Sequence, residues 1–178
     1  MTPKASVYIA TSLDGFIARP DGGLDWLKHD SGGDDYGFYD FMSTVDTLVM
    51  GRNSYETVLT FGEWPYEGTP VVVMSQTLDN AAIPQHLTGK VEITADTPKA
   101  LVEKLGNEGR KHLYIDGGKI IRSFLNEGLI QELIISRIPV LIGQGIPLFG
   151  PLDNDIQLTH LETKTYPSGL VQSRYRVR

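Results

Sequence analysis

Residues 47–56, with the sequence TLVMGRNSYE, limit the fold of this chain more than any other stretch. The first four of these residues form a short apolar run of the kind that becomes a strand buried on both faces. Gly51 then lets the backbone turn, and Asn53 or Ser54 can cap a helix that follows. The predicted order is therefore strand, turn and helix. The inward face of that helix would consist of Tyr55, Val58 and Leu59.

The turn between this strand and this helix is suited to an anionic ligand. A helix N-terminus presents unpaired N–H groups and a partial positive charge, and Arg52 adds a forked donor that fits a phosphate. An ordinary strand-to-helix turn with Arg52 on the surface explains the same residues equally well. Both interpretations stay open on these residues alone.

A long, glycine-rich segment precedes this element. Residues 14–34 follow a predicted first strand over residues 4–11, and a loop of that length in a compact domain is more often functional than idle. Four residues after it recur at the spacing of one helix face, namely Asp35, Phe38, Tyr39 and Met42. A carboxylate thus heads an otherwise apolar face, where desolvation would raise its pKa. Helix capping explains the same aspartate equally well.

The remaining residues alternate between strand and helix patterns. Strands are predicted over residues 71–74, 91–94, 112–115 and 131–141, with helices beginning near Pro98 and Gly118. Residues 156–165 and 170–177 are expected to pair as a hairpin. Strands that alternate with helices imply right-handed crossovers and a parallel sheet. The predicted fold class is α/β: residues 1–178 form a single domain with a mostly parallel mixed sheet, flanking helices and a C-terminal antiparallel hairpin.

A second glycine-bearing turn, Asp116-Gly117-Gly118, follows the strand predicted over residues 112–115. Ligands of open α/β sheets bind outside the carboxyl ends of the strands, where both turns are expected to lie. A pyrophosphate needs close backbone approach and N–H donors from more than one side. Together the two turns predict a dinucleotide site. Gly143-Gln144-Gly145 lacks the third glycine of the common dinucleotide fingerprint and is interpreted as a turn.

Composition excludes several other functions. The chain has 178 residues, 40% of them hydrophobic, and a net charge of -6, which argues against a nucleic-acid partner. The absence of cysteine removes disulfides, thiolate nucleophiles and cysteine-bound metals, and the four histidines show no metal-ligand spacing. No apolar run approaches the roughly 18 residues that span a membrane, and no signal pattern is present. We expect a cytoplasmic protein without a metal or a membrane partner.

Four motifs, in this order along the chain, resemble the dihydrofolate reductase-like superfamily. They are SLDGFIA at residues 12–18, MGRNSYE at residues 50–56, DGG at residues 116–118, and Glu132-Leu133 with PVLIGQGIPLF at residues 139–149. The resemblance is strongest to the reductase domain of bacterial riboflavin biosynthesis, the RibD C-terminal domain, and to its stand-alone relatives. It covers about residues 5–177. It implies a dihydrofolate reductase-like fold and an NADPH-dependent oxidoreductase acting on a small-molecule substrate.

The resemblance also implies which residues hold NADPH. The phosphate-binding positions of the family fall on Gly51, Arg52, Asn53 and Ser54 and on Asp116, Gly117, Gly118 and Lys119, and Ile120 is expected at the cofactor as well. The loop that covers the nicotinamide would contribute Ala10, Ile17 and Ala18. Relatives often carry a basic residue for the adenosine 2′-phosphate after the third strand, where this chain has Ser75 and Gln76 followed by Thr77. The preference for NADPH over NADH therefore stays open.

The substrate is less closely defined by the resemblance. We expect hydride transfer to a pteridine- or aminopyrimidine-type substrate, with Trp26, Phe38 and Tyr39 at the substrate. Asp35 is the candidate proton donor and Asp14 the second candidate. The zinc ligands of the deaminase usually fused to riboflavin-pathway enzymes are absent, which leaves the reductase alone. A true dihydrofolate reductase and a nucleotide-binding module without catalysis are the alternatives. A homodimer is expected as in the riboflavin-type relatives, with contacts near residues 131–141 and the terminal hairpin.

Overall fold

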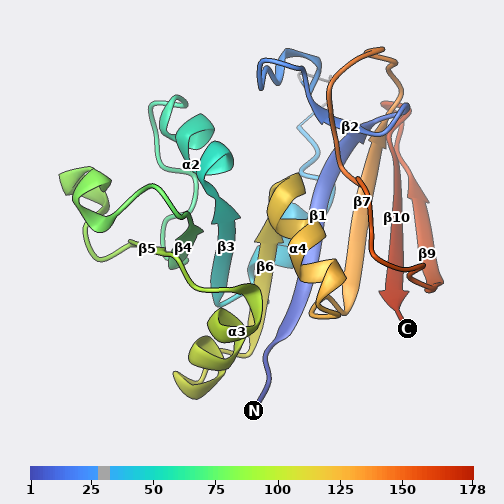
Figure 1. Cartoon of the computed structure of the whole chain (residues 1–178). Helices are drawn as coiled ribbons and strands as arrows, with labels where there is room; N and C mark the ends of the chain where they lie inside the picture. Colours follow the sequence, from blue (N-terminus) through green and yellow to red (C-terminus); the bar gives the residue numbers. More distant parts are fainter. Residues whose placement is uncertain (28–32) are drawn as a thin grey trace.

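An eight-stranded sheet runs through the computed structural model, which describes residues 1–27 and 33–178 (Figure 1). Its strands are β1 (Lys4–Ser12), β3 (Thr47–Gly51), β4 (Val71–Met74), β5 (Val91–Thr94), β6 (His112–Asp116), β7 (Glu132–Ile138), β9 (Leu158–Thr165) and β10 (Val171–Val177). They lie in the order β5-β4-β3-β6-β1-β7-β10-β9. Neighbouring pairs from β5 to β7 are parallel, whereas β10 runs antiparallel to β7 and β9. The predicted α/β class, with its mostly parallel sheet and C-terminal hairpin, is confirmed.

Helices cover both faces of this sheet. They are α1 (Phe38–Met42), α2 (Arg52–Leu59), α3 (Pro98–Asn107) and α4 (Gly118–Asn126), with short 3-10 helices η1 (Asp25–Leu27), η2 (Asn80–Ala82) and η3 (Gln85–Leu87). One apolar cluster joins Leu101 of α3 and Phe124 of α4 to the sheet, and Figure 1 shows these helices in front of it. A second cluster joins Phe41 of α1 and Tyr55 of α2 to the opposite face. Among the described residues, no helix has the length and apolar character needed to cross a membrane.

Strand β6 shows how the sheet divides its side chains between the two faces. Leu113 and Ile115 belong to the cluster under α3 and α4, whereas Tyr114 belongs to the cluster under α1 and α2. Because successive side chains of a strand point to opposite faces, Asp116 follows Tyr114 onto the α1 and α2 side. The last residue of β6 is therefore a carboxylate next to an aromatic cluster.

A two-stranded sheet lies over the ends of β1 and β7 (Figure 1). Its strands are β2 (Phe16–Ala18) and β8 (Ile146–Pro147), which run antiparallel. The backbones approach closely: a Cβ atom on Gly145 would lie 2.3 Å from the carbonyl oxygen of Ala18. Part of the segment predicted as a loop over residues 14–34 is thus strand β2 and helix η1. Residues 28–32 of that segment, including His29, lie outside the described residues.

Two other predicted boundaries were wrong. The strand expected over residues 131–141 ends at Ile138, because Pro139 has no N–H group for the ladder. Helix α2 begins at Arg52 with Gly51 as its N-cap, and no side chain forms a cap hydrogen bond there. Neither Asn53 nor Ser54 caps this helix, since both lie inside its first turn. Of the predicted inward face, Tyr55 and Val58 are buried and Leu59 is exposed.

Candidate functional site

The two glycine-bearing turns lie side by side at the carboxyl ends of the central strands. Parallel pairing of β3 with β6 sets Met50 opposite Asp116, so the residues that follow each strand become neighbours. A Cβ atom built on Gly117 would lie 2.6 Å from Ser54 Oγ of α2. The turn after β6 therefore contacts the first turn of α2, as the prediction of one joint site requires.

Glycine is needed at both positions of the second turn, for different reasons. Gly117 has a φ of 89°, in the left-handed region that side chains rarely adopt. Gly118 opens α4, and a Cβ atom there would lie 3.0 Å from Ile17 Cδ1 and 3.2 Å from the carbonyl oxygen of Pro147. The small β2–β8 sheet thus covers the N-terminus of α4, and the first residues of the helix have no room for a side chain at Gly118.

Arg52 links the ends of β3 and β4. Its Nε donates to Glu56 Oε1 at 2.7 Å, and its Nη1 donates to Thr77 Oγ1 at 3.0 Å. Ser75 Oγ in turn accepts from the backbone N–H of Thr77 at 3.2 Å. One guanidinium and two hydroxyl groups are thereby gathered at an exposed position on this edge. Such a set of donors suits an anionic oxygen group.

The other predicted cofactor residues differ in where they lie. Gln76 donates to the backbone of Ala95 at 2.8 Å and so engages the end of β5. Ile120 is buried, and its Cγ1 would lie 3.0 Å from a Cβ atom built on Gly51. Ile120 therefore packs against the turn after β3. Ile17 lies against Gly118. The remaining positions are half-buried Ala10, buried Ala18, exposed Asn53 and exposed Lys119.

Asp116 is the group whose proton equilibrium is most unusual at this edge. The residue is half-buried, and burial raises the pKa of its carboxyl to about 6, although hydrogen bonds from Gly117 N–H and the Ser54 hydroxyl oppose the shift. The Asp116 charge also helps raise the phenol pKa of Tyr66 and Tyr114, for which burial is the larger cause. A carboxyl group that titrates near neutral pH, next to aromatic rings, can hold or release a proton under physiological conditions.

The two aspartates predicted as proton donors lie in polar surroundings. The Asp35 carboxylate accepts from Tyr39 N–H at 2.8 Å and Gly37 N–H at 3.0 Å, and these bonds lower its pKa. The expectation that desolvation raises the Asp35 pKa was wrong, because the two backbone donors outweigh burial. A hydrogen bond with Ser12 and two backbone N–H groups lower the Asp14 pKa. A catalytic role for either residue stays a prediction.

The predicted substrate residues do not lie together. Phe38 packs edge-on against Tyr8, with 5.6 Å between ring centroids, whereas Tyr39 is 75% exposed. Trp26 is buried in a separate apolar cluster with Ile138 and Leu170. Of these three residues only Phe38, in α1, packs against the large sheet. The substrate role of the three residues stays a prediction.

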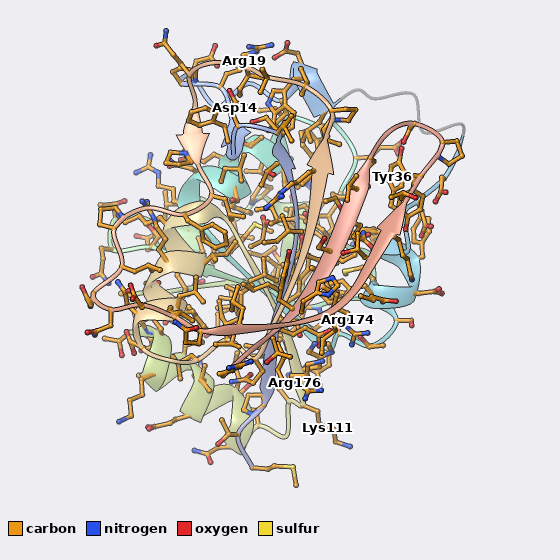
Figure 2. All side chains as sticks on the ribbon, turned by 90° about the vertical axis from the view of Figure 1, so that its right-hand side faces the viewer. Asp14, Arg19, Tyr36, Lys111, Arg174 and Arg176 are labelled. Carbon is orange, nitrogen blue, oxygen red and sulfur yellow. The ribbon has the colours of Figure 1, made fainter. Side chains whose placement is uncertain are left out.

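A cavity of about 340 Å³ lies away from this edge, between α1 and the hairpin near the starts of the strands. Its charged groups pair with one another, since Glu132 binds both Lys4 and Arg174, and Ser6 Oγ lies 2.8 Å from His112 Nε2. Figure 2 shows Asp14 and Arg174 toward opposite ends of the sheet. The glycine turns, in contrast, present the close backbone approach and N–H donors that a pyrophosphate needs, so they are the better candidate site. In the described part of the chain, no three acidic or histidine side chains are grouped as metal ligands.

Comparison with known sequences assigns the family. The sequence model of the RibD C-terminal domain matches residues 3–172. The chain belongs to the RibD C-terminal domain family. The uncharacterized Bacillus subtilis (strain 168) protein YwjB is 37% identical to it over 168 residues, which cover 93% of this chain and 94% of YwjB. YyaP of the same organism, also uncharacterized, is 32% identical over 186 residues, which cover 94% of this chain and 91% of YyaP.

Solved structures of similar proteins agree with this family. A protein from Shewanella sp. PV-4, whose name refers to riboflavin biosynthesis, is 40% identical with a TM-score of 0.92 and covers 98% of this chain and 99% of its own. The Thermotoga maritima diaminohydroxyphosphoribosylaminopyrimidine deaminase/5-amino-6-(5-phosphoribosylamino)uracil reductase has a TM-score of 0.75 at 12% identity. That match covers 99% of this chain and 57% of the Thermotoga chain. At 12% identity it shows a shared fold.

Sequence reasoning placed Asp116 of this RibD C-terminal domain among the phosphate-binding residues and missed its proton chemistry. The available signal was positional. An aspartate that ends an apolar strand, in phase with Tyr114, must lie beside the aromatic cluster on that face.

The raised pKa of Asp116 makes a prediction about stability. Because the folded protein holds this proton more tightly than the unfolded chain does, the Asp116 contribution to stability falls as pH rises from about 4 through the folded pKa of about 6. The Asp116→Asn variant cannot lose stability in this way. We therefore expect the free energy of unfolding of Asp116→Asn minus that of wild type to be about 1–3 kcal/mol larger in neutral than in acidic buffer. Denaturant unfolding across that range measures it. Asp153→Asn, at an exposed position, is the control, and identical pH profiles for Asp116→Asn and wild type would contradict the raised pKa.

Proposed function

We propose that this chain is a cytoplasmic NADPH-dependent reductase that transfers hydride to a C=N or C=O group of a pteridine- or aminopyrimidine-type substrate. One observation carries the proposal: two glycine turns suited to a pyrophosphate and a carboxyl group with a pKa of about 6 meet at one edge of the sheet. The phosphate contacts would bind the cofactor, and the carboxyl group would supply a proton. Membership in the RibD C-terminal domain family supports the same activity.

The arrangement of the strands orients the cofactor along the edge. Arg52, Ser75 and Thr77 stand at the ends of β3 and β4, so this group would hold the adenosine 2′-phosphate. Gly51, Gly117 and Gly118 follow at the ends of β3 and β6 and would hold the pyrophosphate. The nicotinamide would then lie toward β1, which is the next strand in the sheet. When bound there, NADPH supplies the hydride.

Two hydroxyl groups and one arginine favour NADPH over NADH in this arrangement. Ser75, which follows β4, occupies the position where relatives often carry a basic residue, but Arg52 of α2 already reaches Thr77. A phosphate dianion would gain one charge-assisted and two neutral hydrogen bonds there. A ribose hydroxyl would gain much less from the same arginine.

Asp116 is the residue we assign to the proton. Reduction of a C=N or C=O bond leaves negative charge on the acceptor, and a nearby acid lowers the barrier by neutralising it. Asp116 lies at the β6 end of the same edge, with Ser54 holding its carboxyl by a hydrogen bond. With a pKa of about 6, the Asp116 carboxyl can both hold and release a proton near neutral pH, whereas the lowered pKa of Asp35 leaves that group ionised.

The substrate class follows from chemistry and from the named relatives together. A planar heterocycle could stack near half-buried Tyr66, whose phenol interacts with the Asp116 charge. A structure of similar fold is named as a 5-amino-6-(5-phosphoribosylamino)uracil reductase, which supports an aminopyrimidine of that type for this chain. A true dihydrofolate reductase is the alternative that Asp35 ahead of α1 favours. A nucleotide-binding module without catalysis is the alternative if no such substrate is reduced.

Turnover assays distinguish these three hypotheses about the activity. Oxidation of NADPH should be followed with pteridine, aminopyrimidine and carbonyl substrates, and we expect one of the first two classes to be reduced. Asp116→Asn should lower turnover by about 10²–10⁴-fold with nearly unchanged NADPH affinity, as expected for loss of a general acid. Asp35→Asn is the matched comparison. A loss confined to Asp35→Asn would return the proton to Asp35, and NADPH binding without reduction of any substrate would leave a binding module.

Arg52 tests the assignment of the 2′-phosphate. We expect Arg52→Ala to weaken NADPH binding by about 1–3 kcal/mol, the worth of a charge-assisted hydrogen bond, and NADH binding far less. Calorimetric titration with both cofactors gives the two affinities. Lys99→Ala, which removes an exposed cation at the start of α3, is the control. Equal affinity of wild type and Arg52→Ala for NADPH would remove the arginine from the site.

We also propose a homodimer that forms through β7 and the β9–β10 hairpin. Strand β9 is the edge of the large sheet, and an edge strand presents unpaired backbone groups to a partner. Light scattering at micromolar concentration should give twice the mass of one chain. The mass of a single chain under those conditions would end this proposal.

A further inference from the structure

Asp14 joins two loops that are far apart in the sequence. Its Oδ2 accepts from the backbone N–H of Gly143 at 2.8 Å, and its Oδ1 accepts from Ile142 N–H at 3.3 Å. Ser12, two residues earlier at the end of β1, hydrogen-bonds the same carboxylate, and its Oγ also accepts from Phe16 N–H at 3.0 Å. These bonds lower the Asp14 pKa, so the carboxylate is ionised at neutral pH. The Asp14 carboxylate is therefore charged, and each of its two oxygens accepts a hydrogen bond from a backbone N–H group.

The two loops that Asp14 joins form a unit, which we call the flap: residues 13–18 with residues 140–148. Besides the Asp14 bonds, Leu13 N–H donates to the carbonyl of Val140 at 2.8 Å, and Leu148 N–H donates to that of Gly15 at 3.1 Å. Pairing of β2 with β8 completes the connection. Figure 2 shows Asp14 at the upper end of the molecule, far from Arg174. Asp14 provides side-chain hydrogen bonds that hold the two halves of the flap together.

The flap rests on the candidate site at one point. Ile17 and the carbonyl of Pro147, one from each half, approach the position where a Cβ atom of Gly118 would stand. Gly118 is the first residue of α4, at the β6 end of the edge. In the cofactor orientation proposed above, with the 2′-phosphate at β4 and the pyrophosphate at β3 and β6, the flap would lie over the nicotinamide half. The adenosine half lies several strands away, beside Arg52.

We propose that Asp14 is a positioning residue that binds the two halves of the flap into the arrangement that receives the nicotinamide half of NADPH. The inference rests on the proposed function. It differs from the earlier expectation of a catalytic Asp14, because both carboxylate oxygens are occupied by backbone donors of the flap. Asp14 acts on the cofactor through Ile17 and Pro147 and has no direct part in proton transfer.

Binding of two ligands tests the proposal without a substrate. Adenosine 2′,5′-bisphosphate carries the 2′-phosphate end of the cofactor and lacks the nicotinamide. If Asp14→Ala leaves the flap correctly joined in only about a tenth of the molecules, the apparent dissociation constant for NADPH rises about tenfold. The dissociation constant for adenosine 2′,5′-bisphosphate should stay within about twofold, because its adenosine and 2′-phosphate would lie beside Arg52, several strands away from the flap. Calorimetric titration provides both constants.

Two further variants complete the design. Asp21→Ala is the matched control, since Asp21 is also exposed and accepts a backbone N–H, from Gly23 at 2.9 Å, but within its own turn. It should bind both ligands as wild type does. Asp14→Asn keeps one acceptor oxygen and should weaken NADPH binding by about threefold, which preserves the test if Asp14→Ala does not fold.

Each outcome decides a separate point. Wild type that fails to bind NADPH refutes the proposed function itself. Wild type that binds NADPH, with equal affinity in Asp14→Ala and Asp14→Asn, refutes the role of Asp14 alone. Equal weakening of both ligands would show a general structural defect and also refutes it. Unchanged NADPH affinity with turnover lowered about 10²–10⁴-fold would make Asp14 catalytic and overturn the positioning role.

Discussion

The parallel register between β3 and β6 is the constraint on which the candidate site depends. Met50 pairs with Asp116, so both strands end at the same level and each continues directly into a turn and a helix. A slip of one residue would move one turn by about 3.3 Å and would send every side chain of the strand to the other face. Asp116 would then leave the aromatic cluster, and Gly117 would leave Ser54. Both strands are buried on their two faces, and each face packs into a different apolar cluster. Packing of the core on both faces therefore fixes the register and with it the geometry of the site.

Local periodicity was enough to predict most of the fold. The strands and helices whose apolar pattern lies within one segment were recognised, and the stripe of Leu101, Val102 and Leu105 on α3 is buried as expected. The errors arose where long-range contacts decide the structure. Strand β2 forms by pairing with β8, which lies some 130 residues further along the chain. No local pattern in residues 14–34 could indicate that pairing. The error at the end of β7 had a local cause instead, because Pro139 in the sequence already indicated that the strand ends at Ile138.

Asp14, Asp35 and Asp116 show why the chemistry of the site was harder to predict than the fold. Backbone N–H groups of Tyr39 and Gly37 lower the Asp35 pKa, and the Ser12 side chain together with backbone N–H groups lowers the Asp14 pKa. Asp116 stands at the end of a buried strand, where burial outweighs its two hydrogen bonds and raises its pKa. The residue type is the same in all three, and the difference lies in the donors that the folded chain brings to each carboxyl group. The glycine turns, in contrast, could be placed from sequence because strand ends are encoded locally.

We propose above all that NADPH binds along the carboxyl ends of β4, β3, β6 and β1. Backbone amide chemical shifts of isotopically labelled protein, followed during titration with NADPH, test this most directly. The largest changes are expected at Gly51, Arg52, Gly117 and Gly118, with smaller ones on the flap. Changes concentrated around Lys4, Glu132 and Arg174, at the opposite end of the sheet, would contradict the account, and so would the absence of any change at saturating NADPH.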